Sequence, residues 1–174
     1  RTVDIQRVID SVLRLAAARA RSQRVEIHRN FSRYLPPAKV DVERMDGVFS
    51  NLVTNALDAM PEGGHLTVTI KEALDQKQVL VEIANTGKGI PPRRRAQLFT
   101  PFFTTKPDGT GLGLAICQRV VDEHQGSISV ESKISGPNKG TRFIVTLPIA
   151  SQEKEPPPSP IKVVDELLVA QKAI

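Results

Sequence analysis

Apolar side chains recur every three to four residues in three stretches of this chain. The stretches span residues 4–21, 42–60 and about 112–124. This spacing collects the apolar side chains on one face and predicts three amphipathic helices. The segment from Pro61 to Gly64 ends the second helix, and Gly126 ends the third.

Shorter stretches follow the period of two that is typical of strands. They cover residues 24–31, 66–70, 79–83, 127–131 and 141–147. Four to five strands combined with three long helices predict an α+β fold. We expect a two-layer α/β sandwich in which the three helices cover one face of a mixed sheet.

Residues 87–113 follow neither period. This segment is rich in glycine and proline and has only a short helical pattern near residues 93–99. Irregular segments of this length inside a compact domain are usually functional. The composition changes again after Pro148, where a proline-rich run precedes a short amphipathic pattern at 161–173. We therefore assign residues 1–149 to one domain and residues 150–174 to a linker with a short helix.

Charge and composition narrow the classes of partner. The net charge is +5, but the basic residues are scattered, and the few aromatic residues do not alternate with them. We therefore expect no nucleic-acid binding. No run of 18 apolar residues and no signal peptide is present, so we expect no membrane contact by this segment. The single cysteine, Cys117, suits a cytoplasmic location, which is compatible with a membrane-anchored parent protein. The chain starts at Arg1 within a helical pattern and reads as part of a longer protein.

Polar side chains interrupt the apolar second helix at Asn51, Asn55 and Asp58. The spacing of four and then three residues places them on one stripe of the helix. Amide and carboxylate oxygens are hard ligands that suit Mg²⁺ shared with phosphate groups. The alternative is that the asparagines cap neighbouring loops.

Glycines mark two further blocks. Gly87 and Gly89 follow a strand directly, where they let the backbone approach a ligand or simply form a turn. Gly109, Gly111 and Gly113 open the third helix, so that backbone N–H groups and a helix N-terminus together favour a phosphate site. Side-chain donors lie in the same block, at Thr105, Lys106 and Thr110.

The order of these blocks resembles the N, G1, F and G2 boxes of the histidine kinase ATP-binding domain. The resemblance covers about residues 2–148 and extends to the closing strand, Gly140 to Phe143 and Leu147-Pro148. It implies the Bergerat-type sandwich shared with gyrase, mismatch-repair ATPases and the heat-shock chaperone ATPase. It also implies a protein-histidine kinase catalytic domain that uses ATP and Mg²⁺. Such a domain phosphorylates a histidine on a separate helical phosphoacceptor domain of the same protein, for relay to a response regulator.

The resemblance also implies roles for individual residues. Asn55 would ligate Mg²⁺ with Asn51 beside it, and residues 91–110 would form a mobile lid anchored by Phe99, Phe102 and Phe103. The implied nucleotide-binding residues are Asn51, Asn55, Asp58, Asn85, Gly87, Gly89, Ile90, Phe99, Thr105, Lys106, Gly109, Thr110, Gly111, Leu112, Gly113, Leu114 and Thr141.

Asn85 departs from the family pattern, which has aspartate at this position to accept a hydrogen bond from the adenine amino group. An amide still accepts through its oxygen, and half a turn of the amide would present a donor instead. We therefore expect ATP binding with loosened base selectivity. A weakened or inactive kinase is the alternative.

Two other functions fit parts of the pattern. A hydrolytic ATPase of the gyrase type needs a glutamate where this chain has Asn51, and an amide cannot activate water as a base. A nucleotide-sensing module without catalysis is favoured only if Asn85 abolishes binding. His28, His65 and His124 lack a flanking carboxylate placed to act as a base, so we expect structural roles rather than phosphoacceptor roles for them.

Overall fold

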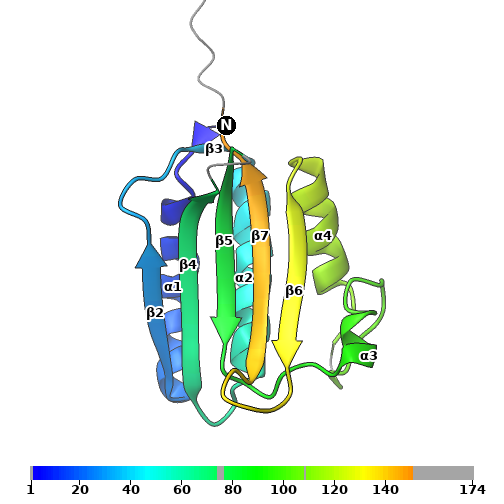
Figure 1. The fold of residues 1–174 in the computed structure, drawn as a ribbon. Coiled ribbons are helices and arrows are strands. Elements are labelled where there is room, and N and C mark those ends of the chain that lie inside the picture. Colours follow the sequence, from blue (N-terminus) through cyan, green and yellow to red (C-terminus); the bar gives the residue numbers. More distant parts are fainter. Residues whose placement is uncertain (1, 74–76, 108, 151–174) are drawn as a thin grey trace, which may run out of the picture.

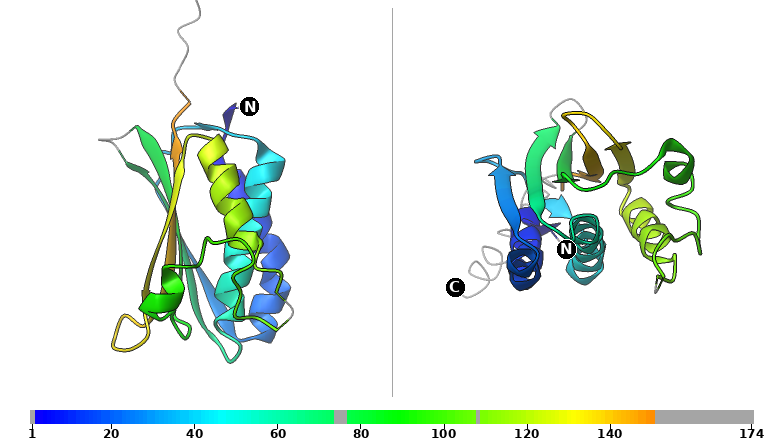
Figure 2. Two further views of the ribbon diagram at one scale, coloured as in Figure 1. Left: turned by 90° about the vertical axis from the view of Figure 1, so that its right-hand side faces the viewer. Right: turned by 90° about the horizontal axis from the view of Figure 1, so that it is seen from below.

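The computed structural model describes residues 2–73, 77–107 and 109–150, which form two layers (Figure 1, Figure 2). The helices are α1 (Ile5–Ser22), α2 (Val42–Asp58), α3 (Pro92–Arg95) and α4 (Gly113–Glu123). The strands are β1 (Thr2–Val3), β2 (Val25–Phe31), β3 (Ala38–Lys39), β4 (Gly64–Ala73), β5 (Gln78–Asn85), β6 (Ser127–Lys133) and β7 (Gly140–Pro148).

Five strands form one mixed sheet in the order β2-β4-β5-β7-β6. The strands β2 and β4 are parallel, and the other neighbouring pairs are antiparallel. The three long helices α1, α2 and α4 lie side by side on one face of this sheet, and none of the described helices lies on the other, open face (Figure 2). The predicted two-layer α+β sandwich is confirmed.

The core lies between the sheet and the three helices. Strand β4 shows the alternation clearly, because Leu66, Val68 and Ile70 are buried whereas the residues between them are more exposed. The buried side chains of the helices are those that the helical period predicts, such as Val8, Val12 and Leu52. The buried side chains are therefore mostly aliphatic, as the low aromatic content requires.

Side-chain hydrogen bonds fix the ends of the two longest helices. Asp4 and Asp41 cap the N-termini of α1 and α2 by accepting from the N–H groups of Gln6 and Arg44. Beyond α1, the Gln23 Nε2 group donates to the carbonyl oxygens of Leu57 and Met60 at 2.9 and 3.0 Å. These bonds hold the C-terminal end of α2, which carries the predicted polar stripe.

Three details differ from the sequence-based expectations. The short antiparallel pair β1 and β3 was not predicted, because two residues are too few to show a period. The strands of the large sheet extend beyond most of the predicted ranges, and α3 covers only part of the expected 93–99 segment. The expected helix at 161–173 lies outside the described residues. No helix in the described part of the chain is long and apolar enough to cross a membrane.

Candidate functional site

Four elements meet at one end of the sandwich. They are the C-terminal half of α2, the end of β5, the start of β7 and the N-terminus of α4 (Figure 1). A cavity of about 410 Å³ lies there, within the size range of small-molecule sites. Most of the predicted nucleotide-binding residues line it, namely Asn51, Asn55, Asp58, Asn85, Gly89, Ile90, Thr105, Lys106, Gly109, Thr110, Gly111, Gly113, Leu114 and Thr141.

Three predicted site residues do not line this cavity. Gly87 packs against the end of α2, where an added Cβ would lie 2.3 Å from the Ala59 carbonyl oxygen. Phe99 packs against the hydrophobic core. Leu112 occupies the N-cap position of α4 behind the lining residues.

The cavity also has lining residues that were not predicted as nucleotide-binding: Ala59, Lys88, Pro91, Arg94, Leu98, Phe103, Thr104, Pro107 and Phe143. Several adjoin predicted residues in the sequence, so a wider window around each motif would have found them. Phe143 was missed for another reason. It lies on β7 opposite Ile83 of β5. Its place beside the site follows from the pairing of these two strands, which the sequence does not specify.

The predicted polar stripe forms one connected network. Asn55 Nδ2 donates to Asn51 Oδ1 at 3.0 Å, and Lys106 Nζ donates to Asn55 Oδ1 at 2.7 Å. Lys106 Nζ also pairs with the Asp58 carboxylate. The ammonium group of Lys106 therefore lies between the oxygen atoms of Asn55 and Asp58, and so the stripe can hold a positive charge. These oxygens fit Mg²⁺, for which carbonyl and carboxylate ligands are suitable.

Asp58 is the charged centre of this network. Its carboxylate pairs with Arg19 of α1 as well as with Lys106 of the lid. Burial raises the pKa of the Asp58 carboxyl group, but the hydrogen bonds and charges of Lys106 and Arg19 outweigh burial and lower that pKa below its ordinary value. Asp58 is therefore ionised at neutral pH and is poorly suited to accept a proton.

We expect Asp58 to make folding stability depend on pH. A carboxyl group whose pKa is lowered by folding stabilises the fold above its unfolded pKa, and this contribution is lost as the pH falls through the folded value. Asp58→Asn should lower the free energy of unfolding at pH 7 by about 1 kcal/mol. The variant should also lose less stability than the wild type below about pH 4. Urea unfolding between pH 7 and pH 3 measures both effects, and identical pH profiles would contradict this role.

Asn85 ends β5 directly opposite Thr141 of β7, and both residues are buried. Its Oδ1 atom accepts a hydrogen bond from the N–H of Gly87 at 2.9 Å. Half a turn of the amide would point its NH₂ group at that N–H donor. The expected free rotation of this amide is therefore opposed by Gly87, and Nδ2 is the amide atom that has no partner among the described residues.

Two glycines lie in close contact with neighbouring residues, Gly111 with backbone and Gly113 with a side chain. Gly111 has φ of +70°, and its carbonyl oxygen accepts from the Phe102 N–H at 2.9 Å. Gly113 begins α4 against the polar stripe, where an added Cβ would lie 2.4 Å from Asn51 Nδ2. No side chain among the described residues caps α4, so its first N–H groups are available to an anion in the cavity.

The start of the lid is fixed to strand β6. Ile90 N–H donates to Ser132 Oγ at 2.7 Å, and Arg95 Nη1 donates to the Ser132 carbonyl oxygen at 3.0 Å. Ser132 Oγ also lies 2.8 Å from Thr141 Oγ1. The lid therefore leaves the sheet at a defined point beside the cavity.

The three histidines and the cysteine lie outside the cavity lining. His124 has a structural role, as expected, because its Nε2 atom accepts from the Asp41 N–H and its Nδ1 atom lies 2.7 Å from the Val120 carbonyl oxygen. Cys117 is buried, which raises the pKa of its thiol to about 12, so it acts as a core residue. His28 and His65 lie close together on the open face of the sheet.

Known proteins resemble this arrangement in sequence. A family model described as the histidine kinase-, DNA gyrase B- and HSP90-like ATPase matches residues 40–151. The chain belongs to this family. Within it, the relatives that the chain matches are kinases, several of them named sensor histidine kinases. Sporulation kinase E of Bacillus subtilis is 36% identical over 87% of the chain, and the sensor histidine kinase ZraS of Klebsiella oxytoca is 37% identical over 88%. The chain spans only 20% and 32% of the lengths of these two relatives.

Solved structures agree with this assignment to the histidine kinases. The catalytic domain of histidine kinase ThkA has a TM-score of 0.77 and 31% identity, over 86% of this chain and 95% of its own. Full-length ShkA, solved in complex with AMPPNP, has a TM-score of 0.76 and 32% identity over 86% of this chain and 31% of its own. ThkA in complex with the response regulator TrrA has a TM-score of 0.73 and 28% identity over 88% of this chain and 43% of its own.

Proposed function

We propose that this histidine kinase catalytic domain binds Mg²⁺-ATP and presents the γ-phosphate to a histidine on a separate helical phosphoacceptor domain, for relay to a response regulator. One observation supports this most strongly. The oxygen atoms of Asn55 and Asp58 share one cavity with the glycine-rich N-terminus of α4. A cation site and an anion site thus lie side by side, as a metal-bound polyphosphate requires.

Different parts of the cavity lining would meet different parts of the nucleotide. Asn55, with Asn51 beside it, would hold Mg²⁺, which would neutralise phosphate charge. Gly109, Gly111 and the first turn of α4 would donate to the phosphates. Asn85 would meet the base. The AMPPNP complex of ShkA supports nucleotide binding by a domain of this kind.

The chemistry left to the domain is positioning and charge stabilisation, which are most of what phosphoryl transfer requires. The alternative of ATP hydrolysis needs a base for water. Asn51 is an amide whose Oδ1 atom already accepts from Asn55. The one carboxylate among the described lining residues is Asp58, which is held ionised by two cations. Transfer to a nucleophile from another domain is therefore favoured over hydrolysis.

Radiolabelled ATP tests the proposal. We expect the chain alone to bind Mg²⁺-ATP without becoming labelled, because His28 and His65 lie on the open face of the sheet and His124 is engaged by Asp41. A helical phosphoacceptor domain, added as a separate polypeptide, should acquire acid-labile label. Acid-labile label on the chain itself would contradict the proposal. Binding without any transfer would favour the nucleotide-sensing alternative.

A further inference from the structure

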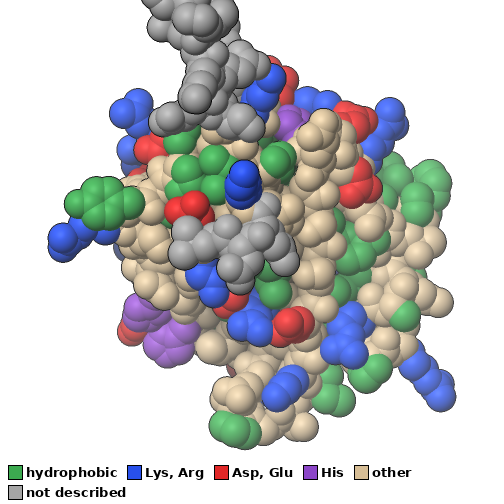
Figure 3. Space-filling model, turned by 45° about the horizontal axis from the view of Figure 1, so that its top comes forward, with side chains coloured by type: hydrophobic (Ala, Val, Ile, Leu, Met, Phe, Trp, Pro, Cys, Tyr) green, Lys and Arg blue, Asp and Glu red, His purple; other side chains and the backbone are tan. Residues whose placement is uncertain are grey.

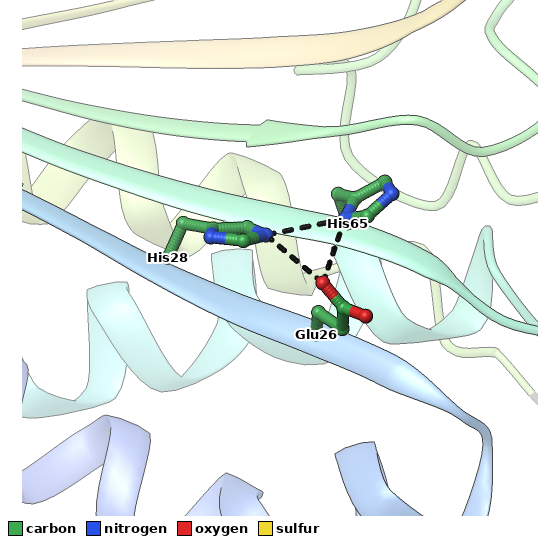
Figure 4. Close-up of side chains that lie close together, drawn as sticks. All are labelled: Glu26, His28 and His65. Carbon is green, nitrogen blue, oxygen red and sulfur yellow. Dashed lines mark hydrogen bonds and ion pairs between the residues drawn. The ribbon is translucent and has the colours of Figure 1, made fainter.

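Three potential metal ligands meet on the face of the sheet that no helix of the described residues covers. Glu26 and His28 are two residues apart on β2 and so share a face, and Glu26 lies opposite His65 in the pairing of β2 with β4. Their side chains point toward one another (Figure 4). All three side chains are exposed, with fractions of 70%, 52% and 53%. Histidine side chains are visible beside an acidic one on this surface (Figure 3).

The distances between the ligand atoms match the edges of a small tetrahedron. His28 Nε2 and His65 Nδ1 lie 3.1 Å apart, and Glu26 Oε2 lies 3.5 Å from each. Zn²⁺ bonds of about 2.0–2.2 Å to nitrogen and oxygen place neighbouring tetrahedral ligands about 3.3–3.5 Å apart. One ion near the centre of this group would therefore reach all three atoms with little movement.

Hydrogen bonding satisfies the group only in part. A neutral imidazole has one N–H group and one acceptor nitrogen. If His28 Nε2–H donates to His65 Nδ1, that proton is used between the two rings. Glu26 Oε2 then faces His65 Nδ1 with no proton between them. A dication would satisfy the three lone pairs at once, because imidazole nitrogens and carboxylate oxygens are both ligands of Zn²⁺.

We propose that Glu26, His28 and His65 form a Zn²⁺ site of this domain, with a fourth position open to water. Two imidazole nitrogens favour Zn²⁺ over Mg²⁺, which prefers oxygen ligands. The site is distinct from the nucleotide cavity, because none of its three residues lines that cavity.

The bound ion would join two strands that are otherwise linked by their backbones. In the part of the chain that the structure describes, β2 is an edge strand and β4 is its one neighbour in the sheet. His65 also exchanges hydrogen bonds with Thr86, through its N–H to Thr86 Oγ1 and its carbonyl oxygen from the Thr86 N–H. The site therefore stiffens the sheet edge close to the end of β5.

Calorimetric titration of the 174-residue chain with zinc chloride, without nucleotide, tests the site. We expect one ion per chain for the wild type, and binding at least tenfold weaker for His28→Gln, His65→Gln and Glu26→Gln. Asn30→Ala is the matched control, because Asn30 is exposed and lies two residues beyond His28 on the same face. It should bind zinc as the wild type does. Magnesium chloride should give no binding at these residues.

Thermal unfolding gives a second readout, since a ligand of the folded state raises Tm. Zinc should raise the Tm of the wild type and of Asn30→Ala, and it should do so much less in the two histidine variants. Absence of zinc binding by the wild type, or equal affinity in the histidine variants, would overturn the site. Full binding by Glu26→Gln would overturn the three-ligand set. Because all three side chains are exposed, circular dichroism should show folded variants throughout.

Discussion

Asn55→Ala should abolish magnesium-dependent nucleotide binding while the domain stays folded. Asn55 Oδ1 is one of the two oxygens that hold the Lys106 ammonium in this structure, and we propose that it holds Mg²⁺ when nucleotide binds. Mutations that merely disturb the orientation of a metal ligand weaken affinity by about 10- to 100-fold. Loss of the ligand itself should therefore weaken Mg²⁺-ATP binding by more than about 100-fold.

Calorimetry with and without Mg²⁺ measures this effect. Thr54→Ala is the matched control, because Thr54 adjoins Asn55 on α2 but is exposed and outside the cavity lining. It should bind Mg²⁺-ATP as the wild type does. An Asn55→Ala variant that keeps the full magnesium dependence would assign the metal to other residues.

Asn85→Asp should tighten ATP binding and widen the ratio of the GTP and ATP dissociation constants. Gly87 N–H holds the Asn85 oxygen, so the NH₂ group is the part of the amide left for the base. Two donors would then meet if the adenine amino group lies there, as the family resemblance implies. A carboxylate instead keeps one oxygen for Gly87 and offers the second to adenine.

An unpaired buried polar group costs roughly 1–3 kcal/mol, which corresponds to about tenfold or more in affinity. Competition binding with ATP and GTP measures the ratio for both proteins. Asn30→Asp makes the same chemical change on the exposed face of β2 and should leave the ratio unchanged. If Asn85→Asp also leaves it unchanged, the shape of the pocket rather than this side chain selects the base.

The fold was predictable because its long elements follow clear periods. α1, α2 and α4 each bury one apolar stripe, and the helical spacing locates that stripe directly. The order of the strands was not predictable in the same way. The parallel pairing of β2 with β4 joins segments on either side of α2, and no local pattern specifies it.

The candidate site was predictable where chemistry is concentrated in short motifs. Asn51, Asn55 and Asp58 share a helical stripe, and the glycines at the start of α4 stand at alternate positions of one short segment. Contacts between distant segments carry no such signal. The Lys106 bond to Asn55 crosses 51 positions, and the Gly87 bond that orients Asn85 depends on how the chain turns after β5. The zinc ligands were missed for the same reason, because His65 is far from Glu26 in the sequence and becomes its neighbour only in the sheet.

The contact of Lys106 with Asn55 lowers the affinity for Mg²⁺ that an experiment would measure. The Lys106 ammonium group and Mg²⁺ would compete for the same Asn55 oxygen, so binding of the metal replaces a singly charged group with a doubly charged ion rather than filling an unpaired site. The exchange breaks the contacts of Lys106 with α2 and leaves Arg19 as the ion-pair partner of Asp58. A measured dissociation constant then reports the difference between two ion pairings and understates the strength of the metal contact. Lys106 thus acts as a built-in counter-ion. It balances the charge of the Asp58 carboxylate until Mg²⁺ arrives with a nucleotide.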